Sequence, residues 1–268
     1  MPATTVLVFL CGLAAIPSGT VAEHELNTGQ ETSTATELIA ALRDQDPEAR
    51  ARAACELRNL GDRAAGAADA LAVLLSDGSP VARAACERWW GRGNSDHQTT
   101  VGEIAASALV AIGSPSLATL ETALERASWI ARRNAAWALG ALDENRAVPR
   151  LIEAVRDREA PVREQAAWAL GAIGHRDAVP ALIEALEDDA AGVREQAAWA
   201  LGALDDARAV AGLLKTLRDA DAGVREQSAW ALGAIGDQQA VNELLAALED
   251  RHAGVRRQAA WALGVISK

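Results

Sequence analysis

The chain has 268 residues, half of them apolar, with a net charge of −11 and a pI near 4.9. This apolar content is enough for a continuous core in one domain or two. The acidic balance argues against a nucleic-acid partner, which requires Lys and Arg clustered on one face. Tyr is absent and Phe occurs once, so the eight Trp residues are almost the only aromatic side chains. Their positions therefore deserve particular weight.

Residues 1–22 have the pattern of an export signal, with an apolar run from Val6 to Ile16, a Pro-Ser-Gly break and a small residue at Ala22. The run is too short to span a bilayer, which takes about 20 residues. We expect removal of residues 1–22 and an exported protein, periplasmic or extracellular. No Lys or Arg precedes the run, so a mis-assigned start codon and a cytoplasmic protein are the alternative. Residues 23–35 lack apolar periodicity and predict a flexible linker.

A unit of 31 residues recurs from residue 116 onward. Four near-identical copies begin at Ala147, Ala178, Ala209 and Ala240, and a weaker one begins at Ser116. Two divergent copies precede them, the second lengthened by an insertion at about 87–104 that is rich in turn formers. We expect repeats near 36–64, 65–115, 116–146, 147–177, 178–208, 209–239 and 240–268.

Each copy predicts two short helices. In the fourth copy, apolar residues at i, i+3, i+4 and i+7 mark the first helix: Val148, Leu151, Ile152 and Val155. A turn follows at 157–160, and the second helix runs over 162–173 and ends at a glycine. Helices this short are marginal alone, so each pair must pack on its neighbours. The predicted fold is all-α, a right-handed α-solenoid of about seven two-helix repeats over 36–268.

The segment VREQAAWALGAIG at 162–174, with its copies, resembles the HEAT-like repeats of the phycobilin-lyase type. The resemblance covers 36–268 and implies an interaction scaffold. Relatives of this kind also include phycobilin lyases and deoxyhypusine hydroxylases, the latter similar to di-iron enzymes with repeated His-Glu pairs. Only His24-Glu25 matches that motif, outside the repeats, and no residue stands out as a lyase equivalent. An enzyme or subunit of either type is the alternative to a scaffold.

The Trp residues of the second helices form the main candidate site. On a helical wheel Trp168 lies about 240° from Val162, away from the core face, with Glu164 near it. Stacked repeats would align these residues on the concave side, where solenoids bind partners. Trp beside carboxylate suits a protein or peptide segment bearing Lys or Arg. The alternative is that the indoles simply cover the Ala pairs of the next repeat. The expected partner-binding residues here are Trp137, Trp168, Trp199, Trp230, Trp261, Glu164, Glu195, Glu226, Gln165, Gln196 and Gln227.

Arg and Asp also recur with the repeat. The Arg residues lie on the flank of the second helix and the Asp residues at the turn before it, which predicts a structural ladder bridging neighbouring repeats. Its members are Asp157, Arg163, Asp188, Arg194, Asp219, Arg225, Asp250 and Arg256.

The insertion and the end of the array offer further candidates. Trp89 and Trp90 cannot both pack on one helix face, so one is expected in solvent or over the groove, as a binding residue or as packing under a long loop. Cys55 and Cys86 occupy adjacent repeats and could pair if the protein is exported. Free thiols are the default expectation, because packed helices lie about 8 to 10 Å apart and a disulfide needs Cα atoms within about 7 Å. The last repeat has no polar cap, which suggests self-association, a docking partner or a truncated gene.

The sequence gives no candidate for catalysis, a metal or a cofactor. The four His residues are scattered over linker, insertion and loops, and no P-loop, CxxC, HExxH or nucleophile elbow is present. A detached module of a larger receptor or protease is a third interpretation.

Overall fold

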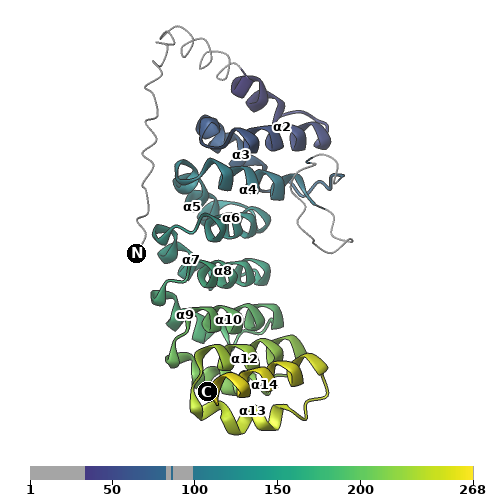
Figure 1. The fold of residues 1–268 in the computed structure, drawn as a ribbon. Helices are drawn as coiled ribbons and strands as arrows, with labels where there is room; N and C mark the ends of the chain where they lie inside the picture. The colour runs from purple at the N-terminus through teal and green to yellow at the C-terminus, as the bar shows by residue number, and fades with distance from the viewer. Residues whose placement is uncertain (1–33, 83–85, 87–98, 268) are drawn as a thin grey trace, which may run out of the picture.

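The computed structural model describes residues 34–82, 86 and 99–267, and Figure 1 shows a column of stacked helices. The described residues contain no strand, only an isolated bridge between Pro80 and Thr100. The chain is an α-solenoid, in agreement with the predicted fold class. Each repeat consists of a shorter helix, here called helix A, and a longer one, called helix B.

Helices B follow one another through the array: α2 (Pro47–Leu60), α4 (Val101–Ile112), α6 (Trp129–Leu142), α8 (Ala160–Ile173), α10 (Ala191–Leu204), α12 (Ala222–Ile235) and α14 (Ala253–Ile266). Each packs directly on the next. Helices A are residues 34–41, α3 (Ala68–Leu74), α5 (Leu117–Arg126), α7 (Val148–Ala154), α9 (Val179–Ala185), α11 (Val210–Thr216) and α13 (Val241–Ala247). A short 3₁₀ segment directly precedes every helix A from α3 onward.

The ends of helix B show why the segment stops there. Gly174 and Gly236 take positive φ angles of 74° and 72° after α8 and α12, as C-cap glycines do. After α6 and α10 the same left-handed position is filled by Asp143 and Asp205, residues that tolerate it better than most. Pro161 stands in the first turn of α8, where a missing N–H does no harm.

Two expected boundaries differ from the structure. Residues 34–35, the last two of the predicted linker, are helical, whereas 1–33, including the proposed signal, lie outside the described residues. The last four residues of the insertion expected at 87–104 belong to α4, because Thr100 caps that helix with Glu103 in a reciprocal capping box.

A continuous core of Ala, Leu and Val runs along the array. In α8 the side chains of Ala166, Ala167, Ala169 and Leu170 are fully buried. Small residues let adjacent helices B approach closely: a Cβ built on Gly171 would lie 2.6 Å from the Cβ of Ala200 in the next helix B. The small Gly and Ala residues of helix B are therefore required for the close packing between repeats.

Candidate functional site

The indoles of the recurring Trp residues in helices B lie at the boundaries between repeats. Trp137, Trp168, Trp199 and Trp230 are half-buried against the core, whereas Trp261 in the last repeat is 43% exposed. A Cβ built on Gly171 would lie 2.8 Å from Cζ3 of Trp199, and the same relation joins Gly140 to Trp168, Gly202 to Trp230 and Gly233 to Trp261. Each ring edge thus lies over the glycine of the preceding repeat. The wheel placed these rings away from the core, and the packing alternative had them cover the next repeat; in the structure they reach back to the preceding one.

The glutamates one turn earlier lie toward the following repeat. A Cβ built on Gly192, in the first turn of α10, would lie 2.7 Å from Oε2 of Glu164. Glu195 has the same relation to Gly223, and Glu226 approaches Gly254. Each glutamate therefore fills space that a glycine leaves open at the start of the next helix B. Where Arg133 replaces the glutamate, Pro161 replaces the glycine, so the two positions vary together.

The negative charge of two of these glutamates is not balanced by cations in the described part of the array. Among the described residues, Glu164 and Glu195 form no ion pair and no side-chain hydrogen bond. Burial raises the pKa of the Glu195 carboxyl, and the negative charges of Asp221, Glu164 and Glu226 raise it further. Uncompensated negative charge is therefore concentrated in the middle of the array.

Cations close both ends of the row. Nη2 of Arg257 lies 2.8 Å from a carboxylate oxygen of Glu226, and Nη2 of Arg133 lies 3.1 Å from one of Glu103. Beside the glutamates, the half-buried Gln165, Gln196 and Gln227 make no side-chain hydrogen bond within the described residues. We call the central surface formed by Glu164, Glu195, Gln165, Gln196, Trp168 and Trp199 the acidic Trp row.

The Arg and Asp residues form repeated bidentate ion pairs. Nε and Nη2 of Arg163 donate to the two carboxylate oxygens of Asp188 at 2.6 and 2.7 Å, and its Nη1 donates to the carbonyl of Asp157 at 2.9 Å. The same geometry joins Arg132 to Asp157, Arg194 to Asp219 and Arg225 to Asp250. The hydrogen bond from Arg194 lowers the pKa of Asp219, in spite of its burial. Each pair ties helix B of one repeat to the turn of the next.

Two details of this ladder differ from the expectation. Arg132, which the sequence analysis missed, is the partner of Asp157, and the repeat spacing applied one copy earlier would have found it. Arg256 bridges no repeats: its Nη1 donates to the carbonyls of Asp250 and Arg251, and within the described residues its Nε and Nη2 have no partner.

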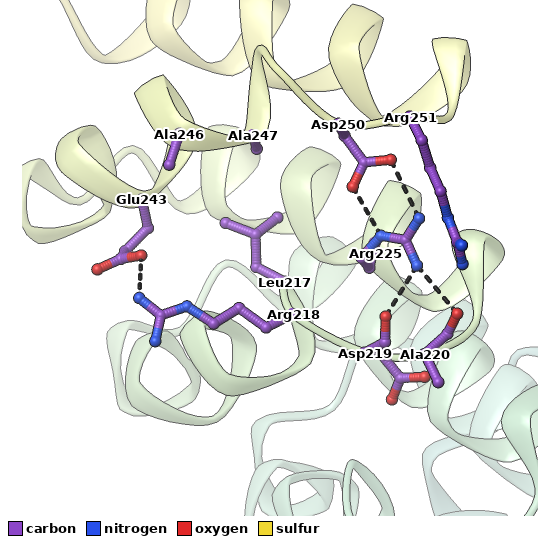
Figure 2. A pocket seen from close by; sticks show the side chains of 10 residues that line it. All are labelled: Leu217, Arg218, Asp219, Ala220, Arg225, Glu243, Ala246, Ala247, Asp250 and Arg251. Atoms are coloured by element: carbon purple, nitrogen blue, oxygen red, sulfur yellow. Dashed lines mark hydrogen bonds and ion pairs between the residues drawn. The ribbon is translucent and has the colours of Figure 1, made fainter.

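A hollow of about 470 Å³ lies beside the last of these pairs, between α13 and the turn that follows α11 (Figure 2). Arg225 is held there by Asp250 on one side and by the carbonyls of Asp219 and Ala220 on the other. Arg218 pairs with Glu243 at 2.5 Å across the same hollow. Because these groups already pair with one another, we assign no ligand to this hollow.

Cys55 and Cys86 are joined, which corrects the default expectation of free thiols. A disulfide links Cys55 in α2 to Cys86, with Cα atoms 5.9 Å apart. The expectation assumed two packed helices, but Cys86 lies after α3 ends at Leu74 and before α4 begins at Val101. The distance between packed helices therefore did not apply. Trp89 and Trp90 lie outside the described residues.

Trp129, at the start of α6, is 40% exposed and was not singled out from the sequence, because it does not recur with the repeat. No three metal-ligating side chains gather within the described part of the chain. In that same part, every helix is too short or too polar to cross a membrane.

Comparisons with known proteins agree with this architecture. A family model described as HEAT repeats matches residues 94–170, 148–229 and 210–268, more than half of the chain. The fold is similar to that of the karyopherin Kap121p bound to the extreme C-terminus of the protein phosphatase Cdc14p, with a TM-score of 0.70 and 16% identity over 91% of this chain and 30% of that one.

Two enzyme structures are also similar over most of the chain, but at lower TM-scores. The CpcE and CpcF complex of phycocyanin lyase from Nostoc matches at 0.47 with 22% identity, covering 98% of this chain and 99% of that one. Human deoxyhypusine hydroxylase matches at 0.42 with 24% identity, covering 91% and 99%. No curated protein gave a significant sequence match.

Proposed function

The chain belongs to the HEAT-repeat family, and we propose that it is a non-catalytic scaffold that binds a cationic segment of a partner protein on the acidic Trp row. The observation that carries this proposal is that, within the described residues, Glu164 and Glu195 form no ion pair, whereas Arg163 and Arg194 in the same two helices are each paired with an Asp. Lys or Arg side chains of a partner would supply the missing counter-charge. HEAT-repeat solenoids commonly present such extended surfaces to other proteins.

The contacts of the glutamates support a partner role in addition to packing. Packing against Gly192 and Gly223 explains why a side chain of this size stands there, but it does not require a charge. Arg at the same position, Arg133, shows that the repeat accepts other side chains when the opposing residue changes. The carboxylate is thus the feature that packing leaves unexplained.

The indoles add a second kind of contact. Trp168 and Trp199 reach back over the preceding glycines yet stay only half-buried. An exposed indole face attracts Lys or Arg through cation–π contact, at about 0.5 to 2 kcal/mol each.

The repeat spacing suggests the form of the segment. Packed helices lie about 8 to 10 Å apart, and a chain in the extended polyproline II conformation advances about 3.1 Å per residue with three residues per turn, so that every third side chain lies on the same face. A cationic side chain at every third residue would therefore meet one glutamate per repeat. We expect an extended segment with that spacing to bind better than one with clustered charges.

Fluorescence-labelled peptides test the proposal by anisotropy. One carries Arg at every third position, a second has the same composition with its Arg residues clustered, and a third carries Glu in place of Arg. We expect the first to bind most tightly, and Glu164→Gln with Glu195→Gln to weaken it at least about tenfold, as the loss of charge-assisted hydrogen bonds would do.

The matched control removes two charges elsewhere, through Glu187→Gln with Glu249→Gln, both exposed and outside the acidic Trp row. It should leave binding within about twofold once general screening is held constant by salt. Equal binding of the Glu peptide, or equal loss in both double variants, would show that the acidic Trp row is not the site.

A further inference from the structure

Within the part of the chain that the structure describes, the Arg–Asp ladder has an unpaired member at each end. Asp44, in the first repeat, holds the position of Asp157, because each lies six residues before the Arg that donates to its carbonyl: Arg50 at 2.7 Å and Arg163 at 2.9 Å. At the other end, Arg256 holds the position of Arg163 in the last repeat. Among the described residues the carboxylate of Asp44 meets no cation, and Nε and Nη2 of Arg256 meet no carboxylate.

Both groups are already oriented as their paired equivalents are. A carboxylate oxygen of Asp44 accepts from the N–H of Asp46 at 2.8 Å, as that of Asp188 accepts from Ala190 at 2.9 Å. Nη1 of Arg256 is held by the carbonyls of its own turn at 2.7 and 3.1 Å, leaving the Nε and Nη2 edge available. Little side-chain ordering would be needed to form one more rung.

The faces around these two groups are also complementary. Gly264 would accept a Cβ without meeting any atom within 4 Å, whereas its equivalents Gly171, Gly202 and Gly233 are each covered by the next repeat. Beside it lies a hollow of about 410 Å³ lined by Val241, Leu245 and Leu263, among others, and Leu245 is 51% exposed. In the first repeat, Leu38 is only half-buried, although its equivalent Leu151 is fully buried.

A second charge pair would form in the same alignment. Arg257 stands where internal repeats have Glu164, and Glu48 stands where they have Gly192. Stacking the first repeat of one copy on the last repeat of another would bring these opposite charges together. In the contacts between internal repeats, a Glu and a Gly occupy the same two positions. One oxygen of Glu48 accepts from the N–H of Ala82 and the other makes no bond within the described residues.

We propose that two copies of this chain associate head to tail, with Arg256 of one copy donating to Asp44 of the other. This inference does not depend on the proposed function. The contact is heterologous, so it propagates to rings or open chains of copies. Glu56 holds the position of Ala200, whose Cβ contacts Gly171 in the internal interface, and Cys55 holds the position of Trp199, so the first repeat is less apolar and cannot pack on Gly264 as closely as an internal repeat would. The association should therefore be reversible and weaker than the stacking of repeats within a chain.

Sedimentation velocity over a concentration series tests the contact with the full chain. The wild type should show concentration-dependent association. Asp44→Arg places Arg against Arg256, and Arg256→Glu places Glu against Asp44, so each variant alone should associate at least about tenfold more weakly. Mixed in equal amounts, the two variants should associate again, because each contact between a copy of one variant and a copy of the other joins opposite charges.

Restoration on mixing excludes misfolding as the cause of the loss. Arg158→Glu, an exposed site in a central repeat, makes the same charge change as Arg256→Glu and should associate as the wild type does. A wild type that stays monomeric throughout would overturn the proposal. So would loss in Arg256→Glu without loss in Asp44→Arg, since that pattern indicates a tail-to-tail contact, or failure of the mixture to associate.

Discussion

The central repeats and the last repeat have nearly the same sequence but different surroundings. Around α10, Gly202 is covered by Trp230 and Ala231, Arg194 is paired with Asp219, and Trp199 is half-buried. Around α14 the equivalent Gly264 is open, Arg256 lacks its Asp, and Trp261 is 43% exposed. In a solenoid the energy of a residue depends on the neighbouring repeat as much as on its own. Matched substitutions in the two regions therefore separate intrinsic terms from interface terms.

The largest difference should come from the indoles. Trp168→Ala with Trp199→Ala should lower the free energy of unfolding by about 4 kcal/mol, less than full burial of both rings would imply, because each is only half-buried. Trp261→Ala should lower it by about 1 kcal/mol, since one side of that ring already faces solvent. Urea denaturation followed by circular dichroism measures both. A loss below about 1 kcal/mol for the double variant would mean that the contacts over the glycines stabilise little.

A single added methyl group should have opposite signs in the two regions. Gly202→Ala places a Cβ 2.6 Å from Cζ3 of Trp230 and 2.7 Å from Cα of Ala231, so the neighbouring helix must move. We expect a loss of about 1 to 3 kcal/mol. Gly264→Ala meets nothing within 4 Å and should stabilise α14 by about 0.5 to 1 kcal/mol through helix propensity.

Thermal and urea unfolding at low protein concentration, where copies do not associate, give both values. Equal effects of the two substitutions would contradict the close packing of helices B.

The sequence predicted whatever depends on the repeat period. Two helices per copy, the glycine after α8 and the three bridging residues Arg163, Arg194 and Arg225 all follow from a pattern of 31 residues. The sequence could not predict whether a side chain contacts the preceding or the following repeat, because the neighbours on both sides have nearly the same sequence. Hence Trp199 was placed against solvent or the next repeat, whereas it covers Gly171 behind it, and Arg132 was missed as the partner of Asp157.

The disulfide was mispredicted for a related reason. Cys86 lies in the one part of the array where the period is broken, so an argument from regular helix spacing failed there. The paired change of Glu164 to Arg133 and Gly192 to Pro161 was visible in the sequence, but its meaning required knowing which repeat faces which.

The smallest effect on the free energy of unfolding should come from removing a charge in the acidic Trp row. Whether that change stabilises or destabilises the fold bears on the proposed function. Burial, with the charges of Asp221, Glu164 and Glu226, raises the pKa of Glu195 in the folded state above its unfolded value. For a carboxyl shifted in this direction, folding favours the protonated form, so its contribution to stability falls as pH rises through the unfolded and then the folded pKa. At neutral pH the charged Glu195 therefore opposes folding.

Glu195→Gln should raise the free energy of unfolding at pH 7 by about 0.5 kcal/mol or less, the scale of a like-charge contact. The gain should shrink toward pH 4, where Glu195 of the wild type becomes protonated. Glu187→Gln, far more exposed and facing Lys215 at 3.4 Å, should give no such gain. A destabilised Glu195→Gln at pH 7 would contradict the absence of a counter-charge. A stabilised variant that also loses the Arg peptide would show that the carboxylate is maintained against folding stability, as expected of a residue whose counter-charge comes from a partner.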